Sequence, residues 1–171
     1  STSGLSCEAV VELPAIALSD ICGEVVDIDV QYEGGFLENS NGGSATLPNG
    51  VSTVVYRATD NSGNINSCSF EVTVTDNEQP TPICEQFTEV SLTSDGIAVV
   101  AAGMFDDGSY DACGPVTIEV RRMTANCDPT DIVFGETVTF CCADLDEEQM
   151  VVLRVTDTAG NYNECMIIAG V

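Results

Sequence analysis

The sequence predicts an all-β protein built from two tandem β-sandwiches, and three observations support this fold class. Short segments rich in β-branched and apolar residues recur along the chain, separated by turns rich in Gly, Asn and Asp. No segment shows the sustained periodicity of an amphipathic helix. A segment near the middle of the chain is repeated near its end, so the chain contains two copies of one structural unit.

The internal repeat relates residues 54–68 (VVYRATDNSGNINSC) to residues 151–165 (VVLRVTDTAGNYNEC) at an offset of 97 residues. Nine of its fifteen positions are identical without gaps. A looser match relates residues 19–23 (SDICG) to residues 110–114 (YDACG). Each copy therefore ends in a T-D-x-x-G-N segment, where Asp, Asn and Gly favour a tight hairpin turn between two strands.

Strand-like segments fill most of each copy. We expect strands over residues 8–13, 24–32, 51–59, 69–75, 86–92, 97–101, 116–123, 136–142, 150–156 and 162–168. The Gly-rich residues 34–43 are expected to form a long loop. Residues 75–82 hold two prolines and two acids but no long apolar side chain. They are therefore predicted to form a stiff linker between domain 1 (residues 1–77) and domain 2 (residues 78–171).

The charge balance excludes several classes of function. The chain has 4 Arg, no Lys and 28 acidic residues, for a net charge of -24, whereas binding to nucleic acid or anionic lipid depends on Lys and Arg. The absence of His excludes Ser-His-Asp and Cys-His nucleophile systems and His-ligated zinc. No apolar run approaches the roughly 20 residues of a membrane span. We therefore expect neither catalysis, nor nucleic-acid binding, nor direct membrane insertion.

The cysteine count points to an oxidising compartment. Nine cysteines in 171 residues exceed ordinary cytosolic usage, and no C-x-x-C metal knuckle is present. Disulfides are therefore expected, and the protein is predicted to be extracellular or on the cell surface. Because nine is odd, at least one cysteine has no partner within this chain.

Residues 56–84 (YRATDNSGNINSCSFEVTVTDNEQPTPIC) resemble the junction between two hyalin repeat (HYR) domains. Residues 7–14 with 19–22 resemble the first half of such a domain, and residues 106–114 with 139–144 are similar to HYR-like repeats of large secreted proteins of Bacteroidota. The resemblance covers nearly the whole chain. It implies tandem immunoglobulin-like or fibronectin-type-III-like sandwiches and a role in extracellular adhesion or surface architecture.

Units of this kind begin with a P-x-x-x-C strand, which domain 2 carries at residues 80–84. Subtracting the repeat offset places the domain 1 equivalent of Cys84 before residue 1. We therefore expect domain 1 to lack its first strand.

The repeat and the resemblance guide the expected disulfides of domain 2. Pairing Cys84 with Cys165 ties the first strand to the last. Cys141 and Cys142 are adjacent on a predicted strand and point to opposite faces, so they need different partners. The favoured pairs are Cys113–Cys142 and Cys127–Cys141; the swapped pairing and a strained vicinal disulfide are alternatives.

In domain 1, Cys7–Cys22 is the favoured pair, which leaves Cys68 as the odd sulfur. The alternative is Cys7–Cys68 with Cys22 free. Since Cys68 is the counterpart of Cys165, its expected partner is a cysteine on a strand from outside these residues. That strand comes from a preceding part of the polypeptide or from a neighbouring subunit.

Oxygen-rich clusters indicate possible calcium binding, because calcium takes its ligands from carboxylates, amides and carbonyls. The best candidate is residues 106–111, which bring three carboxylates around a glycine turn. The candidate ligands are Asp106, Asp107 and Asp111 with Asp157 and Asn161 in domain 2, and Asp20, Asp60 and Asn64 in domain 1. The linker acids Asp76 and Glu78 offer a junction site. In the alternative interpretation, Asp60 and Asp157 simply accept backbone hydrogen bonds in their turns, and Asn64 and Asn161 supply positive φ.

The sequence thus favours an extracellular structural or adhesive repeat module, part of a surface stalk, fibre or filament that self-associates or joins neighbouring repeats. The alternatives are an adhesion domain for a glycan or surface protein, and an accessory domain of a larger secreted enzyme.

Arg121 and Arg122 are adjacent on a predicted strand, so one of them should face each side of the sheet.

Overall fold

The computed structural model describes residues 7–21, 24–124, 126–145 and 147–171, except the side chain of Val26. The chain divides into two compact units, Ser1–Asp76 and Asn77–Val171, one residue from the expected boundary. Regular structure in the described residues consists of β-strands and short 3-10 turns, so the all-β prediction is confirmed. No helix among these residues has the length and hydropathy needed to cross a membrane.

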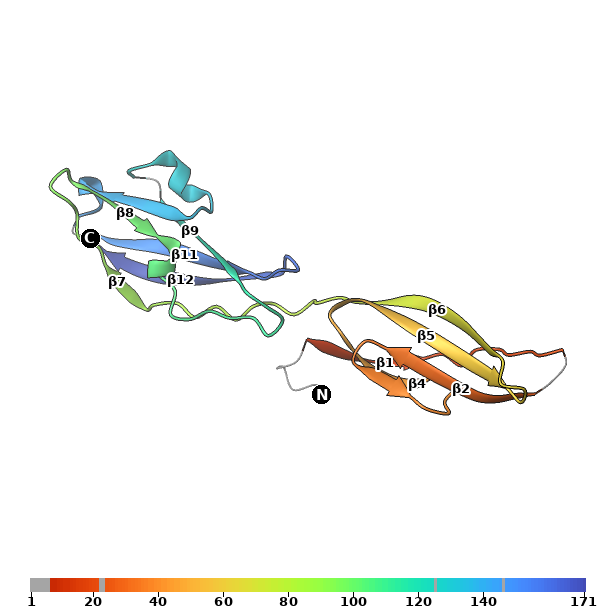
Figure 1. The fold of residues 1–171 in the computed structure, drawn as a ribbon. Helices are drawn as coiled ribbons and strands as arrows, with labels where there is room; N and C mark the ends of the chain where they lie inside the picture. Colours follow the sequence, from red (N-terminus) through yellow and green to blue (C-terminus); the bar gives the residue numbers. More distant parts are fainter. Residues whose placement is uncertain (1–6, 22–23, 125, 146) are drawn as a thin grey trace. The chain divides into compact units, whose positions relative to one another are not determined.

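The first unit contains two antiparallel sheets. Its strands are β1 (Glu8–Leu13), β2 (Val25–Tyr32), β3 (Gly35–Leu37), β4 (Gly43–Pro48), β5 (Gly50–Asp60) and β6 (Ile65–Val74). One sheet pairs β1 with β4, and the other has the order β3-β2-β5-β6 (Figure 1). The repeated T-D-x-x-G-N segment connects β5 to β6, as the hairpin prediction requires.

The core of the first unit lies between its two sheets. Leu13 and Leu47 come from the two-stranded sheet, whereas Val30, Val54 and Tyr56 come from the four-stranded sheet, and all five are at least 95% buried. Alternate residues of β5 face inward because successive side chains of a strand point to opposite faces. Face-to-face packing of two such sheets is the arrangement of a β-sandwich.

The Gly-rich stretch was wrongly predicted to be one long loop. Gly35–Leu37 forms β3, which pairs with β2, and Gly43 begins β4. The glycines bend the chain between these strands: Gly34 has φ +85° in the β2–β3 turn, and Gly42 has φ +97°. A Cβ atom on Gly42 would also lie 2.6 Å from the Leu13 carbonyl oxygen. Glycine here therefore supplies tight turns between short strands.

The second unit also combines a two-stranded sheet with a four-stranded sheet. Its strands are β7 (Phe87–Glu89), β8 (Ile97–Ala101), β9 (Thr117–Arg122), β10 (Thr137–Cys141), β11 (Glu148–Thr156) and β12 (Tyr162–Gly170). Its 3-10 turns are η1 (Ala102–Met104), η2 (Pro129–Ile132) and η3 (Cys142–Asp144). The sheets are β10-β8 and β7-β12-β11-β9, and β7 runs parallel to β12 (Figure 1).

The β11–β12 hairpin is the counterpart of β5–β6, because the repeated segments occupy the same places in the two hairpins. Val151, Leu153 and Val155 of β11 are fully buried, as are Val138 and Phe140 of β10 on the opposing sheet. Each unit therefore has its own sandwich core, and the two cores are built in the same way. The units differ at one edge, where β7 covers β12 but no described strand covers β6.

Candidate functional site: acidic turns, a buried arginine and cysteines

The Asp60 turn uses its carboxylate to fix its own backbone. Asp60 Oδ1 accepts hydrogen bonds from the N–H groups of Ser62 and Asn64, both at 2.8 Å. Its Oδ2 accepts from the Asn64 side chain at 2.7 Å. These hydrogen bonds, chiefly those from Asn64, hold the pKa of Asp60 below its usual value. Most of this carboxylate's hydrogen-bonding capacity is therefore used within the turn.

The Asp157 turn repeats this arrangement in a more buried setting. Asp157 accepts hydrogen bonds from the N–H and the side-chain amide of Asn161, each at 2.8 Å. Burial raises the pKa of Asp157, but these hydrogen bonds outweigh burial and hold the pKa below its usual value. The positive φ in both turns belongs to Gly63 and Gly160 rather than to the asparagines, so the expectation of positive φ at Asn64 and Asn161 was wrong.

Residues 106–111 also form a turn stabilised by carboxylates. Asp106 accepts hydrogen bonds from the N–H groups of Ser109 at 3.0 Å and Gly108 at 3.3 Å. Asp111 accepts from the Cys113 N–H at 2.7 Å. Asp107 is exposed, and its N–H donates to the Ile83 carbonyl.

The structure brings only part of the predicted calcium cluster together. Oxygens of Asp111 and Asp157 lie within 4.8 Å of one another, although the residues are 46 positions apart. Asp106 and Asp107 do not join these two in a shared group among the described residues. In the first unit, Asp60 and Asn64 meet in their turn, while Asp20 is an exposed loop residue.

Two of the expected disulfides are present in the second unit. Cys84 pairs with Cys165 at a Cα–Cα distance of 6.3 Å, which joins the segment before β7 to β12. Cys127 pairs with Cys141 at 5.8 Å. Cys68 on β6 is an exposed free thiol. Cys7 is disulfide-bonded, but the expected pairing with Cys22 lies outside the described residues.

The expected Cys113–Cys142 pair is not formed. Cys142 is an exposed free thiol, whereas Cys113 is disulfide-bonded. Strand alternation was applied one residue too far, because β10 ends at Cys141 and Cys142 begins the η3 turn. The Cys142 sulfur instead lies 3.6 Å from the Gly96 carbonyl oxygen. The swapped pairing and the vicinal disulfide are excluded by the same free thiol.

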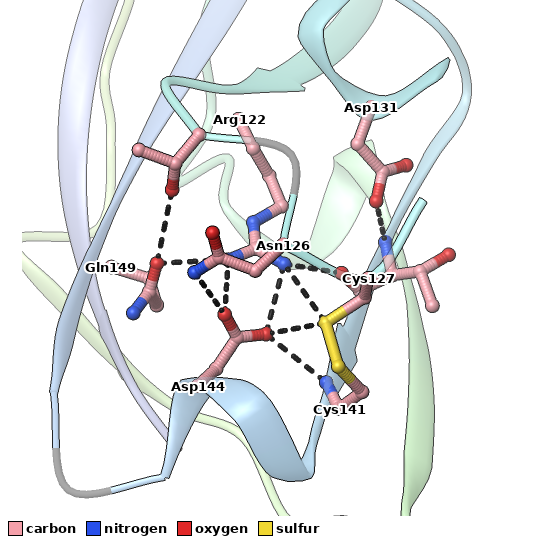
Figure 2. Close-up of polar contacts among 9 residues, drawn as sticks. Arg122, Asn126, Cys127, Asp131, Cys141, Asp144 and Gln149 are labelled. Atoms are coloured by element: carbon pink, nitrogen blue, oxygen red, sulfur yellow. Dashed lines mark hydrogen bonds and ion pairs between the residues drawn. A yellow bond between two sulfur atoms is a disulfide. The ribbon is translucent and has the colours of Figure 1, made fainter. Parts of the chain in front are cut away.

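Arg122 is the largest fully buried side chain among the described residues, and Figure 2 shows its partners. Its two terminal nitrogens donate to the two Asp144 oxygens at 2.9 Å and 2.6 Å. They also donate to the Thr139 carbonyl at 2.6 Å and to Gln149 Oε1 at 2.8 Å. The guanidinium lies 4.8 Å from the Phe140 ring centroid. Arg121, its neighbour, is only half-buried, so the predicted division between two faces is confirmed.

The Asp144 carboxylate completes this buried cluster. It also accepts from the Cys141 N–H at 3.1 Å and from the Asn126 side chain at 3.0 Å (Figure 2). Burial raises the pKa of Asp144, but the hydrogen bonds from Arg122, Cys141 and Asn126 outweigh burial and hold the pKa below its usual value. Cys127 and Cys141 lie close enough to share a metal ion with Asp144, but they are bonded to each other. Because a metal requires thiolates, the cluster has a structural role.

A second arginine cluster lies on the surface of the same unit, and sequence reasoning missed its aromatic partners. Arg154 donates two hydrogen bonds to Glu164 Oε1, at 2.7 Å and 3.0 Å. Its guanidinium lies 3.8 Å from the Phe134 ring centroid and 4.6 Å from that of Tyr162. The only available signal was the position of Arg154 on a strand, which gives its face but not its aromatic partners.

Comparison with known proteins identifies one family. Residues 20–74 match the HYR domain family, a match that spans β2 to β6 of the first unit. No curated protein matches the chain. HYR domains are extracellular repeat modules, so the match and the disulfides together indicate a secreted or surface protein that contains an HYR-like β-sandwich.

Proposed function

We propose that the chain is a non-catalytic structural or adhesive module of a larger extracellular stalk, fibre or filament. The observation that carries this proposal is the position of the Cys84–Cys165 disulfide. The bond lies close to both ends of the second unit, Asn77–Val171, and joins residues 81 positions apart. Tension applied at the two ends therefore passes through the covalent bond and bypasses the sandwich between them.

Single-molecule force extension tests this role. With the disulfide intact, only the short tails of the second unit should extend. A variant with Cys84→Ser and Cys165→Ser should release additional length on unfolding, at most about 220–240 Å, since residues extend by roughly 3.3–3.6 Å each and the Cys127–Cys141 loop stays closed. The matched control carries Cys127→Ser and Cys141→Ser. It should keep the Cys84–Cys165 bond and therefore extend only at its tails. Equal extension of both variants would refute a mechanical role for this bond.

Negative-stain microscopy of native material tests the assembly itself. Fibres or filaments that contain this chain are the expected result. Dispersed particles without lateral or axial contacts would contradict the proposed role in a stalk or filament, whatever the force measurements show.

We also propose that calcium binds beside Asp111 and Asp157. Two carboxylates whose oxygens lie within 4.8 Å repel each other, and Asp157 is only 6% exposed. A divalent cation with oxygen preference would relieve this repulsion. Calcium should therefore raise the melting temperature, and a chelator should reverse the increase. Asp111→Asn should reduce the response, whereas the exposed Asp95→Asn should leave it intact; no response in the unmodified chain would refute the site.

One observation favours an adhesion domain as a second candidate function. An open hollow in the second unit is lined by polar side chains and by the half-exposed Tyr162 ring. The lining residues are Gln79, Gly160, Asn161, Tyr162, Asn163 and Glu164. Amides and a carboxylate beside an aromatic ring suit a sugar ligand. A glycan array with and without calcium tests this candidate, and Tyr162→Ala should abolish any specific signal.

A further inference from the structure

β6 presents an open sheet edge. Along one side it pairs with β5 without a register shift, from Ile65↔Thr59 to Val74↔Gly50. Its other side has no partner strand among the described residues, so β6 ends its sheet (Figure 1). The counterpart β12 lies between β11 and the parallel strand β7. The two edges therefore differ by one strand: β7 covers β12, whereas no described strand covers β6.

The core beneath this edge is incompletely covered. Phe70 and Val72 of β6 correspond through the 97-residue offset to Ile167 and Ala169 of β12. The residues of β12 are 1% and 0% exposed, whereas Phe70 and Val72 are only partly buried. In the second unit, Val90 directly follows β7 and joins the core at 8% exposure. The first unit has apolar side chains that an equivalent strand would bury.

β6 also lacks the features with which proteins usually protect an exposed edge. Such edges are commonly blocked by Pro, Lys, a bulge or a very short strand. β6 is 10 residues long, contains no Pro and no Lys, and its only charged residue is Glu71. An unprotected edge of this length is a template for β-augmentation, in which an added strand gains main-chain hydrogen bonds.

A free cysteine, Cys68, lies on the same edge strand, β6. Cys68 is exposed with a free thiol and corresponds to Cys165, which is bonded to Cys84 three residues before β7. The second unit thus shows what occupies the equivalent position: an extended strand whose cysteine bonds to the edge strand.

We propose that β6 binds a parallel strand from another repeat of the same kind, and that a cysteine of this strand forms a disulfide with Cys68. In the register of β7 on β12, the strand places its third residue after the cysteine opposite Glu71, and its sixth is apolar and covers the core. The chain's own Cys84 segment is already held in the second unit, so the donor is a different repeat. This inference rests on the proposed role in a larger assembly.

The bond forms by thiol–disulfide exchange with a small disulfide such as oxidised glutathione. The Cys68 thiolate attacks one sulfur of this disulfide and releases one glutathione thiol. The thiolate of the incoming strand then attacks the mixed disulfide at the Cys68 sulfur and releases the second glutathione thiol. The two protein thiols lose two electrons and two protons, which the small disulfide takes up.

A synthetic peptide with the sequence of residues 82–92 (PICEQFTEVSL) serves as the donor strand. The oxidised full chain is incubated with this peptide in a glutathione redox buffer, and crosslinks are mapped by mass spectrometry. Cys142 provides an internal control, since it is also an exposed free thiol. We expect at least a tenfold preference for Cys68 over Cys142, and slower amide exchange along β6.

Two chain variants and two altered peptides separate strand pairing from simple thiol reactivity. Cys68→Ser should abolish the crosslink, and Cys142→Ser should leave it unchanged. A peptide with Cys84→Ser should still slow amide exchange in β6, because main-chain pairing does not need the disulfide. A scrambled peptide that keeps the cysteine should show neither effect.

Equal labelling of both free thiols, or equal reaction of the scrambled peptide, would overturn the proposal. A Cys68–Cys68 dimer with slowed β6 exchange in the absence of peptide would also overturn it, because a second copy would then occupy the edge. The microscopy test of filament formation is independent, so failure of the peptide leaves the proposed structural role standing.

Discussion

The buried Arg122–Asp144 pair gives the sharpest test of what stabilises the second unit. Both side chains are 0% exposed and are joined at 2.6 Å. Asp144→Ala would leave the guanidinium buried and without its counter-ion. Removing one partner of a buried pair typically destabilises a protein by about 3–5 kcal/mol. For a domain of this size, that loss corresponds to a decrease of about 15–25 °C in melting temperature.

The same unit contains a matched control. Arg154 and Glu164 form an ion pair at a similar distance, 2.7 Å, but their side chains are 30% and 33% exposed. Water screens such a pair, which typically contributes about 0–1 kcal/mol. Glu164→Ala should therefore shift the melting temperature far less than Asp144→Ala. Both variants are measured by thermal and urea unfolding under oxidising conditions, so that the disulfides remain intact.

A double-mutant cycle separates the pair from its surroundings. Arg122→Met with Asp144→Ala removes both charges, so it should recover part of the stability that Asp144→Ala loses. A single Asp144→Ala loss below about 1 kcal/mol, the range of surface pairs, would refute the interpretation. Strict additivity of the two substitutions would refute it as well, since it would mean that the charges do not interact.

The pH dependence of the same variants supplies a second readout. The pKa of Asp144 in the folded state lies below its usual value. Its contribution to stability is therefore fully present above the unfolded pKa and is lost as the pH falls through the folded pKa. The unmodified chain should lose stability in acid below about pH 4, and Asp144→Ala should lack this component. Parallel pH profiles for the two proteins would contradict the assignment.

Two further predictions concern the disulfides and Asp131 of the second unit. By the chain-entropy model, losing the Cys84–Cys165 bond (Cys84→Ser, Cys165→Ser) should lower the free energy of unfolding by about 4.5 kcal/mol, and losing Cys127–Cys141 (Cys127→Ser, Cys141→Ser) should lower it by about 3 kcal/mol. The two values differ because the sequence separations are 81 and 14. Urea unfolding measures both, and the reverse order would contradict the model. Burial raises the pKa of Asp131, so Asp131→Asn should stabilise the fold at pH 7 in thermal unfolding, and the gain should shrink as the pH falls through the folded pKa; an unchanged or lower melting temperature at pH 7 would refute this.

The strands with strong periodicity could be predicted from the sequence, and those in glycine-rich segments could not. The predicted strand at residues 69–75 falls largely within β6, because alternating apolar and polar residues specify a half-buried strand. β4 was missed because Gly and Ser dominate its beginning, and only the pairing of β4 with β1 reveals the strand. Pairing is a tertiary property that local composition does not contain.

The candidate sites also include features that the sequence predicts and features that it does not. The repeat and the family resemblance together predicted Cys84–Cys165, because they placed Cys84 on the first strand of the unit and Cys165 on the last. The partners of Arg122 could not be predicted, because Asp144 and Gln149 reach it from elements 22 and 27 positions away. Adjacent arginines on a strand indicate that one points inward, but not which carboxylate meets it.

The small number of arginines limits the ion pairs through which this chain can associate with another acidic chain. Of the four arginines, Arg122 and Arg154 are engaged with carboxylates of their own unit, so little positive charge remains to meet an acidic neighbour. Two surfaces of a chain with net charge -24 repel each other across the roughly 8 Å over which physiological salt leaves charges unscreened. Main-chain hydrogen bonds and disulfides act at shorter range and do not depend on side-chain charge. A strand added at β6, with one covalent bond at Cys68, is therefore the mode of association that this composition least opposes, and cations that screen the surface should accelerate it.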